Sequence, residues 1–186
     1  MSVEVHDRTD EELAAEAARE GSDGPAFVAL VDRFRARVWR ICFRLLSNEQ
    51  DANDAAQEVF LRLFLHRKTF EGRSKYATWV HGIAVRACLT IRRGRSRRQK
   101  REVLGPDDTW EQNEPDREAP AEGLKLDLLK MLDTLEDEDR AILLMKYAEG
   151  HDYDELAEIF GMTPSALKMR VSRAREKLKQ RFPNQV

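Results

Sequence analysis

A proline-rich, acidic stretch near the middle of the chain separates two segments that both carry helical hydrophobic periodicity. Residues 102–121 (EVLGPDDTWEQNEPDREAPA) contain three prolines and seven acidic side chains, and they show little periodicity. This composition is typical of a linker, because proline interrupts helices and clustered acids resist burial. We therefore predict an all-α protein with an N-terminal helical bundle at residues 8–101, the acidic linker at 102–121 and a C-terminal domain at 122–186. Residues 1–7 form a tail, and the linker is expected to let the relative placement of the domains vary.

The segment before the linker is predicted to contain four helices. Thr9 and Glu12 have the spacing of a capping box, and Pro25 suits the first turn of a second helix. Apolar residues then recur with helical spacing over 27–45, 55–64 and 79–91. A turn is expected at 48–51, and the fourth helix is expected to begin near Lys75. Four such helices can bury their apolar stripes against one another as a compact bundle.

The segment after the linker has the pattern of a helix-turn-helix domain. Apolar residues at helical spacing over 124–135 and 141–147 predict two helices, and Tyr147 belongs to the second apolar pattern. A short helix at 153–160, a turn at Gly161-Met162-Thr163 and a longer helix from Pro164 follow. Thr163 is suited to cap the longer helix. This order of elements predicts a helix-turn-helix.

The last helix has an apolar face and a basic face. One stripe carries only apolar side chains, at Leu167, Val171, Ala174 and Leu178. Seven basic residues and one acidic residue lie between positions 164 and 181. A solvated surface helix is one interpretation, but such a face usually mixes signs so that charges pair at i,i+4. The excess of positive charge favours an anionic partner, and the hypothesis is a major-groove contact through Lys168, Met169, Ser172 and Arg173.

Polar residues gather on an otherwise apolar helix in the N-terminal half. Within DANDAAQEVFLRLF (51–64), the side chains of Asp54, Gln57 and Glu58 lie near one another. They are either solvated positions opposite the core or part of a contact surface, and the spacing alone is compatible with both.

Aromatic and basic residues follow in the next two stretches. FEGRSKYATWVHGIAVRA (70–87) gathers Phe70, Tyr76 and Trp79 around Gly72. These rings are either core residues or stacking surfaces for unstacked bases, which any aromatic face can receive. LTIRRGRSRR (89–98) is a basic run that continues a helix and is able to hold phosphates.

Composition excludes several classes of protein. The formal net charge of −2 gives no global indication of nucleic-acid binding, yet charge is segregated: residues 92–101 hold seven basic side chains and no acid, and residues 102–122 hold eight acids and one base. Cys42 and Cys88 lie in apolar helical patterns, which predicts buried reduced thiols. No zinc-ligand spacing occurs, and no metal ion or cofactor is predicted. The N-terminus lacks the apolar core of a signal peptide, and no apolar run approaches the ~20 residues of a membrane helix, so we expect a cytoplasmic protein without membrane insertion.

Taken together, three segments resemble bacterial sigma factors of the sigma-70 family, extracytoplasmic-function (ECF) type. DANDAAQEVFLRLF resembles the helix that binds core RNA polymerase, and ATWVHGIAVRACLTIRR is similar to the promoter-melting helix. LDTLEDEDRAILLMKYAEGHDYDELAEIFGMTPSALKMRVSRAREKL resembles the C-terminal helix-turn-helix domain. The resemblance covers nearly the whole chain, in the family's order and with its short acidic linker.

The resemblance implies a promoter-specific transcription initiation factor that is not an enzyme. Its partners would be core RNA polymerase, through the beta and beta-prime subunits, and promoter DNA. An anti-sigma protein often regulates this family, although no residue here identifies one, and the free protein is expected to be a monomer. Core binding would use Asp54, Gln57, Glu58 and Phe60. Contacts to the −10 element would use Phe70, Lys75, Tyr76, Trp79, Arg86, Arg92 and Arg93. The −35 element would be read by Lys168, Met169, Ser172 and Arg173. Family members commonly have Asn where this chain has Arg86, so an unusual −10 preference is expected, because Arg offers only donors.

Three other classes of protein account for less of the sequence. A self-sufficient helix-turn-helix regulator would explain residues 122–186 but leave the features of 51–98 unexplained, and no dimer helix is evident. An enzyme is disfavoured because the chain has no Walker loop, no GxSxG and no HExxH, and because His6, His66, His81 and His151 are scattered among different segments. An adaptor that only sequesters another factor would not need two separate DNA-facing surfaces.

Overall fold

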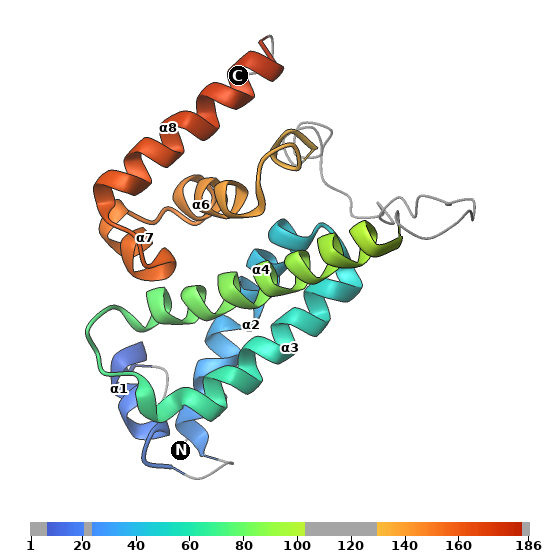
Figure 1. The fold of residues 1–186 in the computed structure, drawn as a ribbon. Coiled ribbons are helices and arrows are strands. Elements are labelled where there is room, and N and C mark those ends of the chain that lie inside the picture. Colours follow the sequence, from blue (N-terminus) through green and yellow to red (C-terminus); the bar gives the residue numbers. More distant parts are fainter. Residues whose placement is uncertain (1–6, 21–23, 103–129, 184–186) are drawn as a thin grey trace.

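The computed structural model describes residues 7–20, 24–102 and 130–183, and within these ranges the regular elements are all helices (Figure 1). They are α1 (Asp10–Ala17), α2 (Pro25–Leu46), α3 (Glu49–His66), the 3-10 helix η1 (Arg67–Thr69), α4 (Tyr76–Glu102), α6 (Asp137–Tyr147), α7 (Tyr153–Phe160) and α8 (Pro164–Arg181). The predicted all-α class is confirmed. Residues 103–129 lie outside the described ranges, and with them most of the predicted linker, Trp110, and the first part of the helix predicted over 124–135.

Local capping explains where the first helices begin. The Thr9 hydroxyl accepts a hydrogen bond from the backbone N–H of Glu12, and the Glu12 carboxylate accepts one from the N–H of Thr9, which completes the predicted capping box. Pro25 occupies the first turn of α2, as expected. The turn predicted at 48–51 is wrong beyond its first residue. Asn48 is extended and caps α3 by accepting from the N–H of Asp51, so the helix already begins at Glu49.

The N-terminal bundle is built from α2, α3 and α4, and α1 packs against α2. Its core is apolar and closely packed; fully buried residues include Leu13, Val38, Ile41, Val59 and Val80. Cys42 and Cys88 are free and completely buried between α2 and α4, as predicted. Hydrogen bonding to Cys42 and burial raise the pKa of the Cys88 thiol far above its usual value, so it stays protonated.

The C-terminal domain is the predicted helix-turn-helix. Asp152 caps α7 in a capping box with Glu155, and Gly161 ends that helix in the left-handed region at φ 66°. Thr163 then caps α8 by accepting from the N–H of Ala166. The apolar stripe of α8 is buried at all four predicted positions. Tyr147 departs from the prediction, because its side chain is 59% exposed at the end of α6 rather than buried with the apolar face.

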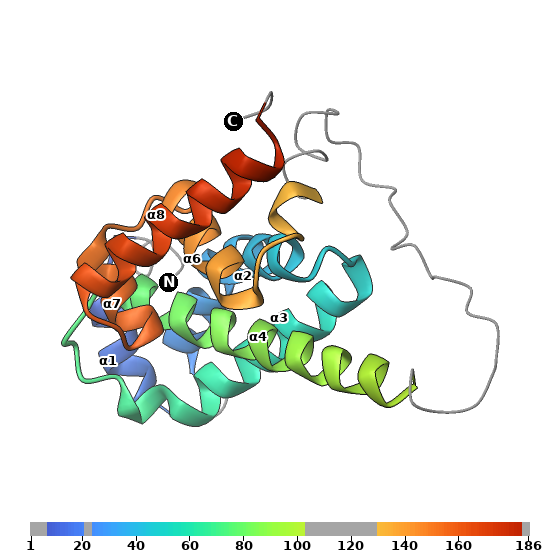
Figure 2. The same ribbon diagram turned by 45° about the horizontal axis from the view of Figure 1, so that its top comes forward.

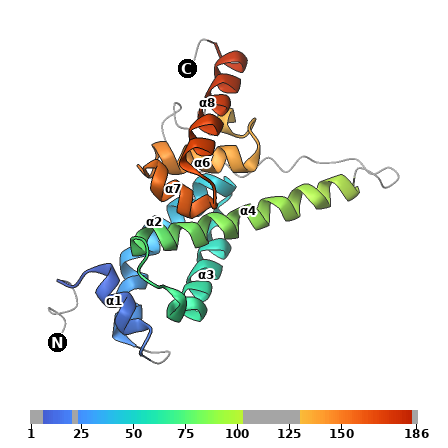
Figure 3. The same ribbon diagram turned by 60° about the vertical axis from the view of Figure 1, so that its left-hand side comes forward.

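The two domains lie against each other. Figures 1 and 3 both show α7 resting on the first half of α4, and α6 also contacts α2 and α4. Figure 2, turned to bring the C-terminal domain forward, shows α8 on the outer side of that domain, away from α3. The basic face of α8 is therefore open while the N-terminal end of α4 is covered.

Candidate functional surfaces

A groove between α2 and α3 gathers most of the predicted polymerase-binding residues. Trp39 forms its wall: the indole Nε1 donates to Asn53 Oδ1 at 2.7 Å, and the ring stacks on Phe43 with centroids 5.2 Å apart. Asp54 and Gln57 are exposed, and Phe60 is half-buried. The groove is lined by Arg35, Ala36, Trp39, Gln50, Asn53, Asp54, Ala56, Gln57 and Phe60.

The structure separates Glu58 from the other predicted members of this surface. Its carboxylate accepts from Arg62 Nε at 2.6 Å, one turn along α3, and it does not line the groove. Sequence reasoning missed the α2 side of the groove, Arg35 and Trp39. These two residues lie one helical turn apart on the half-exposed face of α2. This spacing could have identified them if α3 had been known to pack alongside α2.

The predicted −10 aromatics form one cluster at the start of α4. Phe70, Tyr76 and Trp79 have ring centroids 5.1 to 5.5 Å apart, and Tyr76 also meets Phe34 edge-on at 5.6 Å. Tyr76 is only 2% exposed, and burial raises the pKa of its hydroxyl well above the usual value. Its ring therefore supports the site from within the core, whereas Phe70 and Trp79 remain half-buried at the surface.

The predicted −10 cations are all engaged by the C-terminal domain. Lys75 Nζ donates to Glu155 at 2.9 Å, and this carboxylate raises the pKa of Lys75. Arg86 Nη1 donates to the carbonyl oxygen of Ile159 at 3.3 Å. The remaining two cations form ion pairs with the start of α6, Arg92 with Asp137 and Arg93 with Glu138.

A glycine makes room for the Arg86 side chain. A Cβ placed on Gly82, one turn before Arg86 on α4, would lie 3.2 Å from Nη2 of that guanidinium. Burial, with the nearby charge of Arg62, lowers the pKa of Arg86, although an arginine remains protonated at neutral pH. Arg86 is thus folded back along its own helix toward α7.

The basic face of α8 is exposed where the sequence predicts it. Lys168, Met169, Ser172 and Arg173 all point to solvent, and Met169 is 56% exposed. Two other basic residues of α8 serve the fold instead. Arg170 forms ion pairs with Glu138 and Asp139 of α6, and Lys177 lies 3.7 Å from Asp139. The positive charge that remains for a partner is therefore concentrated on the outer side of the helix.

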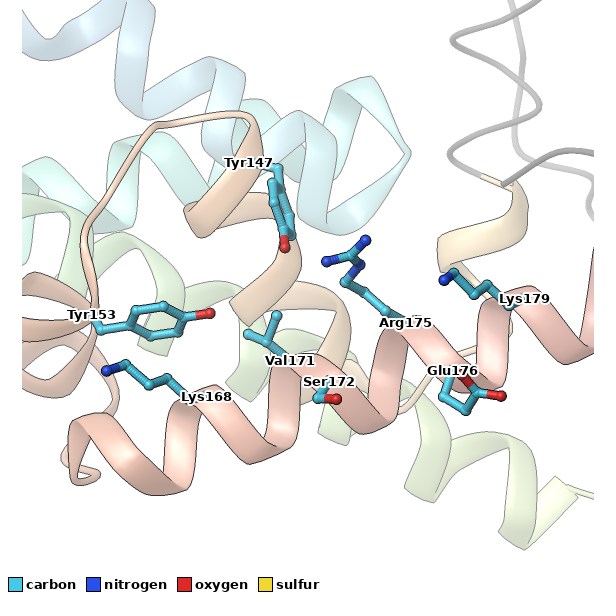
Figure 4. Close-up of a pocket in the computed structure, with 8 residues that line it drawn as sticks. All are labelled: Tyr147, Tyr153, Lys168, Val171, Ser172, Arg175, Glu176 and Lys179. Atoms are coloured by element: carbon cyan, nitrogen blue, oxygen red, sulfur yellow. The ribbon is translucent and has the colours of Figure 1, made fainter.

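A small pocket extends this face toward α6. Figure 4 shows Tyr147, from the end of α6, and Tyr153, from the start of α7, reaching toward the side chains of α8. Lys168 Nζ lies 5.5 Å from the centroid of the Tyr153 ring, which Lys146 Nζ also covers at 4.6 Å. The pocket of about 250 Å³ is lined by Tyr147, Tyr153, Lys168, Val171, Ser172, Arg175, Glu176 and Lys179. The two tyrosines were not predicted as site residues, and the exposure of Tyr147 is the feature that reveals them.

Two protein families match the chain, one in each half. Residues 30–98 match the family described as Sigma-70 region 2, and residues 125–178 match the family described as Sigma-70, region 4. The first match contains the α2–α3 groove and the start of α4, and the second contains the helix-turn-helix. Among the described residues, no helix has the length and apolar character needed to cross a membrane.

Curated relatives resemble the chain over most of its length. The ECF RNA polymerase sigma factor SigW of Bacillus subtilis is 29% identical over 171 residues, which cover 86% of this chain and 90% of that protein. The ECF RNA polymerase sigma factor SigE of Mycolicibacterium smegmatis is 29% identical, over 83% of this chain and 61% of its own. The ECF RNA polymerase sigma-E factor of Haemophilus influenzae is 25% identical, over 94% and 95%.

Two solved structures share the fold. One is the structure of CnrH in complex with the cytosolic domain of CnrY, with a TM-score of 0.67 and 22% identity over 94% of this chain and 97% of that chain. The other is the sigma factor RpoE in complex with the anti-sigma factor NepR from Bartonella quintana, with a TM-score of 0.64 and 22% identity over 83% and 94%.

Proposed function

We propose that this chain, which belongs to the ECF type of the sigma-70 family of transcription initiation factors, divides promoter-specific initiation between its two domains. The N-terminal bundle binds core RNA polymerase and the −10 element, and the C-terminal domain binds the −35 element as duplex DNA. The observation that carries the proposal is that one chain presents an amide- and carboxylate-lined groove on α3 and, on a separate domain, a basic helix-turn-helix face.

The α2–α3 groove suits a helical partner with basic side chains. Asp54 and Gln57 offer acceptors one turn apart, and Trp39 and Phe60 supply apolar walls on either side of them. An aromatic anchor beside exposed polar groups is the composition that protein interfaces favour. We assign the contact with core polymerase to Asp54, Gln57 and Phe60 together with Trp39, and Glu58 supports α3 through Arg62.

Contacts to the −10 element are assigned to the start and the outer side of α4. Phe70 and Trp79 are the half-exposed rings on which an unstacked base can stack, and the buried ring of Tyr76 packs against both. The positive charge for phosphates and base edges comes from α4 and from the residue directly before it. It is supplied by Lys75, Arg86, Arg92 and Arg93. Their present carboxylate and carbonyl partners are oxygen acceptors, as phosphates are.

Contacts to the −35 element are assigned to α8 and the pocket beside it. Lys168, Met169, Ser172 and Arg173 lie in the first three turns of α8, where a recognition helix meets base edges. Met169 is apolar and exposed, which suits the methyl group of a thymine. The pocket adds donors for the DNA backbone, namely Tyr147, Tyr153, Arg175 and Lys179. A protein partner of the anti-sigma class, like the one in the solved complex of the similar sigma factor RpoE, would compete for the same surfaces.

Gel filtration with bacterial core RNA polymerase tests the proposal. The full chain should co-elute with core polymerase, and Asp54→Ala with Gln57→Ala should weaken co-elution. A matched control, Asp7→Ala with Gln180→Ala, removes the same kinds of side chain from exposed positions outside the groove and should leave co-elution unchanged. Absence of co-elution at low salt, with tight binding to duplex DNA alone, would favour a self-sufficient helix-turn-helix regulator instead.

A further inference from the structure

Charged side chains of opposite sign face each other across the contact between the two domains. Glu149, which follows α6, has a side chain only 5% exposed and forms ion pairs with Arg37 and Arg44 of α2. Three of the four cations assigned to the −10 element, Lys75, Arg92 and Arg93, face Glu155, Asp137 and Glu138 of the C-terminal domain in the same way. The acidic side of the C-terminal domain therefore occupies the surface that the −10 element would need.

Two buried histidines join the domains at the centre of this contact. His81 of α4 is 0% exposed and His151, just before α7, is 5% exposed. The distance from His81 Nδ1 to His151 Nε2 is 2.8 Å, and the rings meet edge-on with centroids 4.9 Å apart. His151 Nδ1 lies 3.1 Å from Glu155 Oε2. In the sequence alone these two histidines are unrelated, because they lie 70 positions apart.

The hydrogen bonds limit the number of protons that the pair can hold. Glu155 is ionised: burial opposes its charge, but hydrogen bonds from Lys75, His151 and the N–H of Asp152 outweigh burial and lower its pKa to about 2. A carboxylate only accepts, so His151 donates through Nδ1–H, and in its neutral form this ring accepts at Nε2 from Nδ1–H of His81. Two nitrogens 2.8 Å apart hold a single proton between them. The contact therefore cannot survive when both rings are charged.

The surroundings of His81 also disfavour its cation. Arg37 of α2 and His151 are the basic groups that face it, and Glu155 of α7 is the acidic one. Burial, with the charges of Arg37 and His151, lowers the pKa of His81 to about 3. Its Nε2 is buried and meets no hydrogen-bond partner within the described part of the chain, so a second proton there would have no acceptor.

We propose that this histidine pair is an acid-sensitive latch, which at neutral pH holds the C-terminal domain closed over the −10 surface and on acidification lets the domains part. The masking part of the proposal rests on the proposed −10 assignment, whereas the latch itself rests only on the contact between the domains. In the closed form the acidic surface of the C-terminal domain therefore binds the N-terminal domain of the same chain. DNA gains access to α4 when this contact opens.

The direction of the pH effect follows from the proton count. When the domains part, both rings reach water and each takes a proton below the ordinary histidine pKa of about 6.5. The closed pair takes at least one proton fewer, so the ratio of closed to open chains falls as pH falls below that value. Between about pH 7.5 and about pH 5.5 the ratio should fall about tenfold. Above neutral pH both forms bind the same number of protons, and closure no longer depends on pH.

Small-angle X-ray scattering of the full chain at these two pH values, at constant ionic strength, tests the latch without DNA or polymerase. The radius of gyration should increase on acidification, while far-ultraviolet circular dichroism stays constant because the helices persist. His81→Phe with His151→Leu should remove the increase. His81→Gln should also remove it, since an amide can present either its N–H or its oxygen to His151 in either protonation state. His66→Asn, which removes an exposed histidine from α3, should keep it.

Several results would overturn the latch. These are a wild-type radius that is the same at both pH values, or an increase that persists in His81→Gln and in the double variant. Binding of a fluorescent promoter fragment to the complex with core polymerase, followed over the same pH range, then separates the two parts of the proposal. If the domains part but DNA binding does not change, the latch stands and the −10 assignment is wrong.

Discussion

Replacing Glu149 by glutamine should open the contact between the domains with little effect on either fold. Glu149 follows the last turn of α6, and its carboxylate accepts from Arg37 Nε at 3.1 Å and from Arg44 Nη1. Glutamine keeps the size of the side chain and one acceptor oxygen but removes the charge. Both arginines belong to α2 of the other domain, so the loss falls on the contact between domains.

The magnitude follows from burial. The carboxylate is nearly excluded from water, whereas the two arginine side chains are 39% and 32% exposed and stay partly hydrated when it is neutralised. Hydrogen bonds to charged groups contribute about 1.5–3 kcal/mol each when buried, and partial exposure reduces this. We therefore expect the change to disfavour closure by about 2 kcal/mol, or about thirtyfold in the ratio of closed to open chains.

Scattering at neutral pH and low salt measures this change. Glu149→Gln should give a larger radius of gyration than the wild type, and added salt should shrink the difference as the ion pairs of the wild type are screened. Glu158→Gln, at an exposed carboxylate of α7, is the matched control and should leave the radius unchanged. Equal radii for Glu149→Gln and the wild type would refute the reasoning that a buried carboxylate holds the domains together.

Three further predictions concern single helices. Gly161→Ala should destabilise the C-terminal domain by about 1–2 kcal/mol, because the backbone φ of Gly161 is 66°. Gly94→Ala in α4 should instead stabilise the protein by up to about 1 kcal/mol, because a Cβ at this position meets no atom within 4 Å. Thermal unfolding measures both changes. Arg173→Ala should cost about 1–3 kcal/mol at one base pair of a selected −35 site, whereas Arg175→Ala should weaken all sites alike and reduce the salt dependence by about one ion, as fluorescence anisotropy can measure. Arg86→Asn should change the bases selected from a randomised −10 library in transcription assays, and an unchanged selection would show that Arg86 does not read them.

Periodicity and capping predicted the helices because both are local properties. Thr9 with Glu12 and Gly161 with Thr163 determine helix ends through bonds within a few residues, and these are correct in the structure. The stripe on α8 was predictable for the same reason, since four side chains on one helix report a single buried face. The error at residues 49–51 arose because polar residues in a first helical turn resemble a turn when the cap at Asn48 is overlooked.

The contact between domains was not predictable from the sequence, because periodicity reports which face of a helix is buried and not which other helix covers it. Glu149 beside Gly150 has the composition of a helix terminus, and its ion pairs join positions more than a hundred residues apart along the chain. His81 falls within an apolar pattern and His151 beside a cap, so each has a local interpretation that needs no partner. Tyr76 illustrates the same limit, since spacing could not tell a buried ring from a stacking surface.

The character of the contact explains how a closed chain can still release the residues that we assign to DNA. Lys75 and Arg93 have side chains 74% and 60% exposed, so water and salt screen their ion pairs and these pairs contribute little to closure. A phosphate offers these cations an oxygen of the same kind, so exchanging a carboxylate for DNA costs few hydrogen bonds. Glu149 and the His81–His151 pair have no such replacement, because their partners lie inside the contact. Resistance to opening should therefore reside in the buried groups, and the exposed pairs should determine only how readily DNA takes the place of the acidic surface.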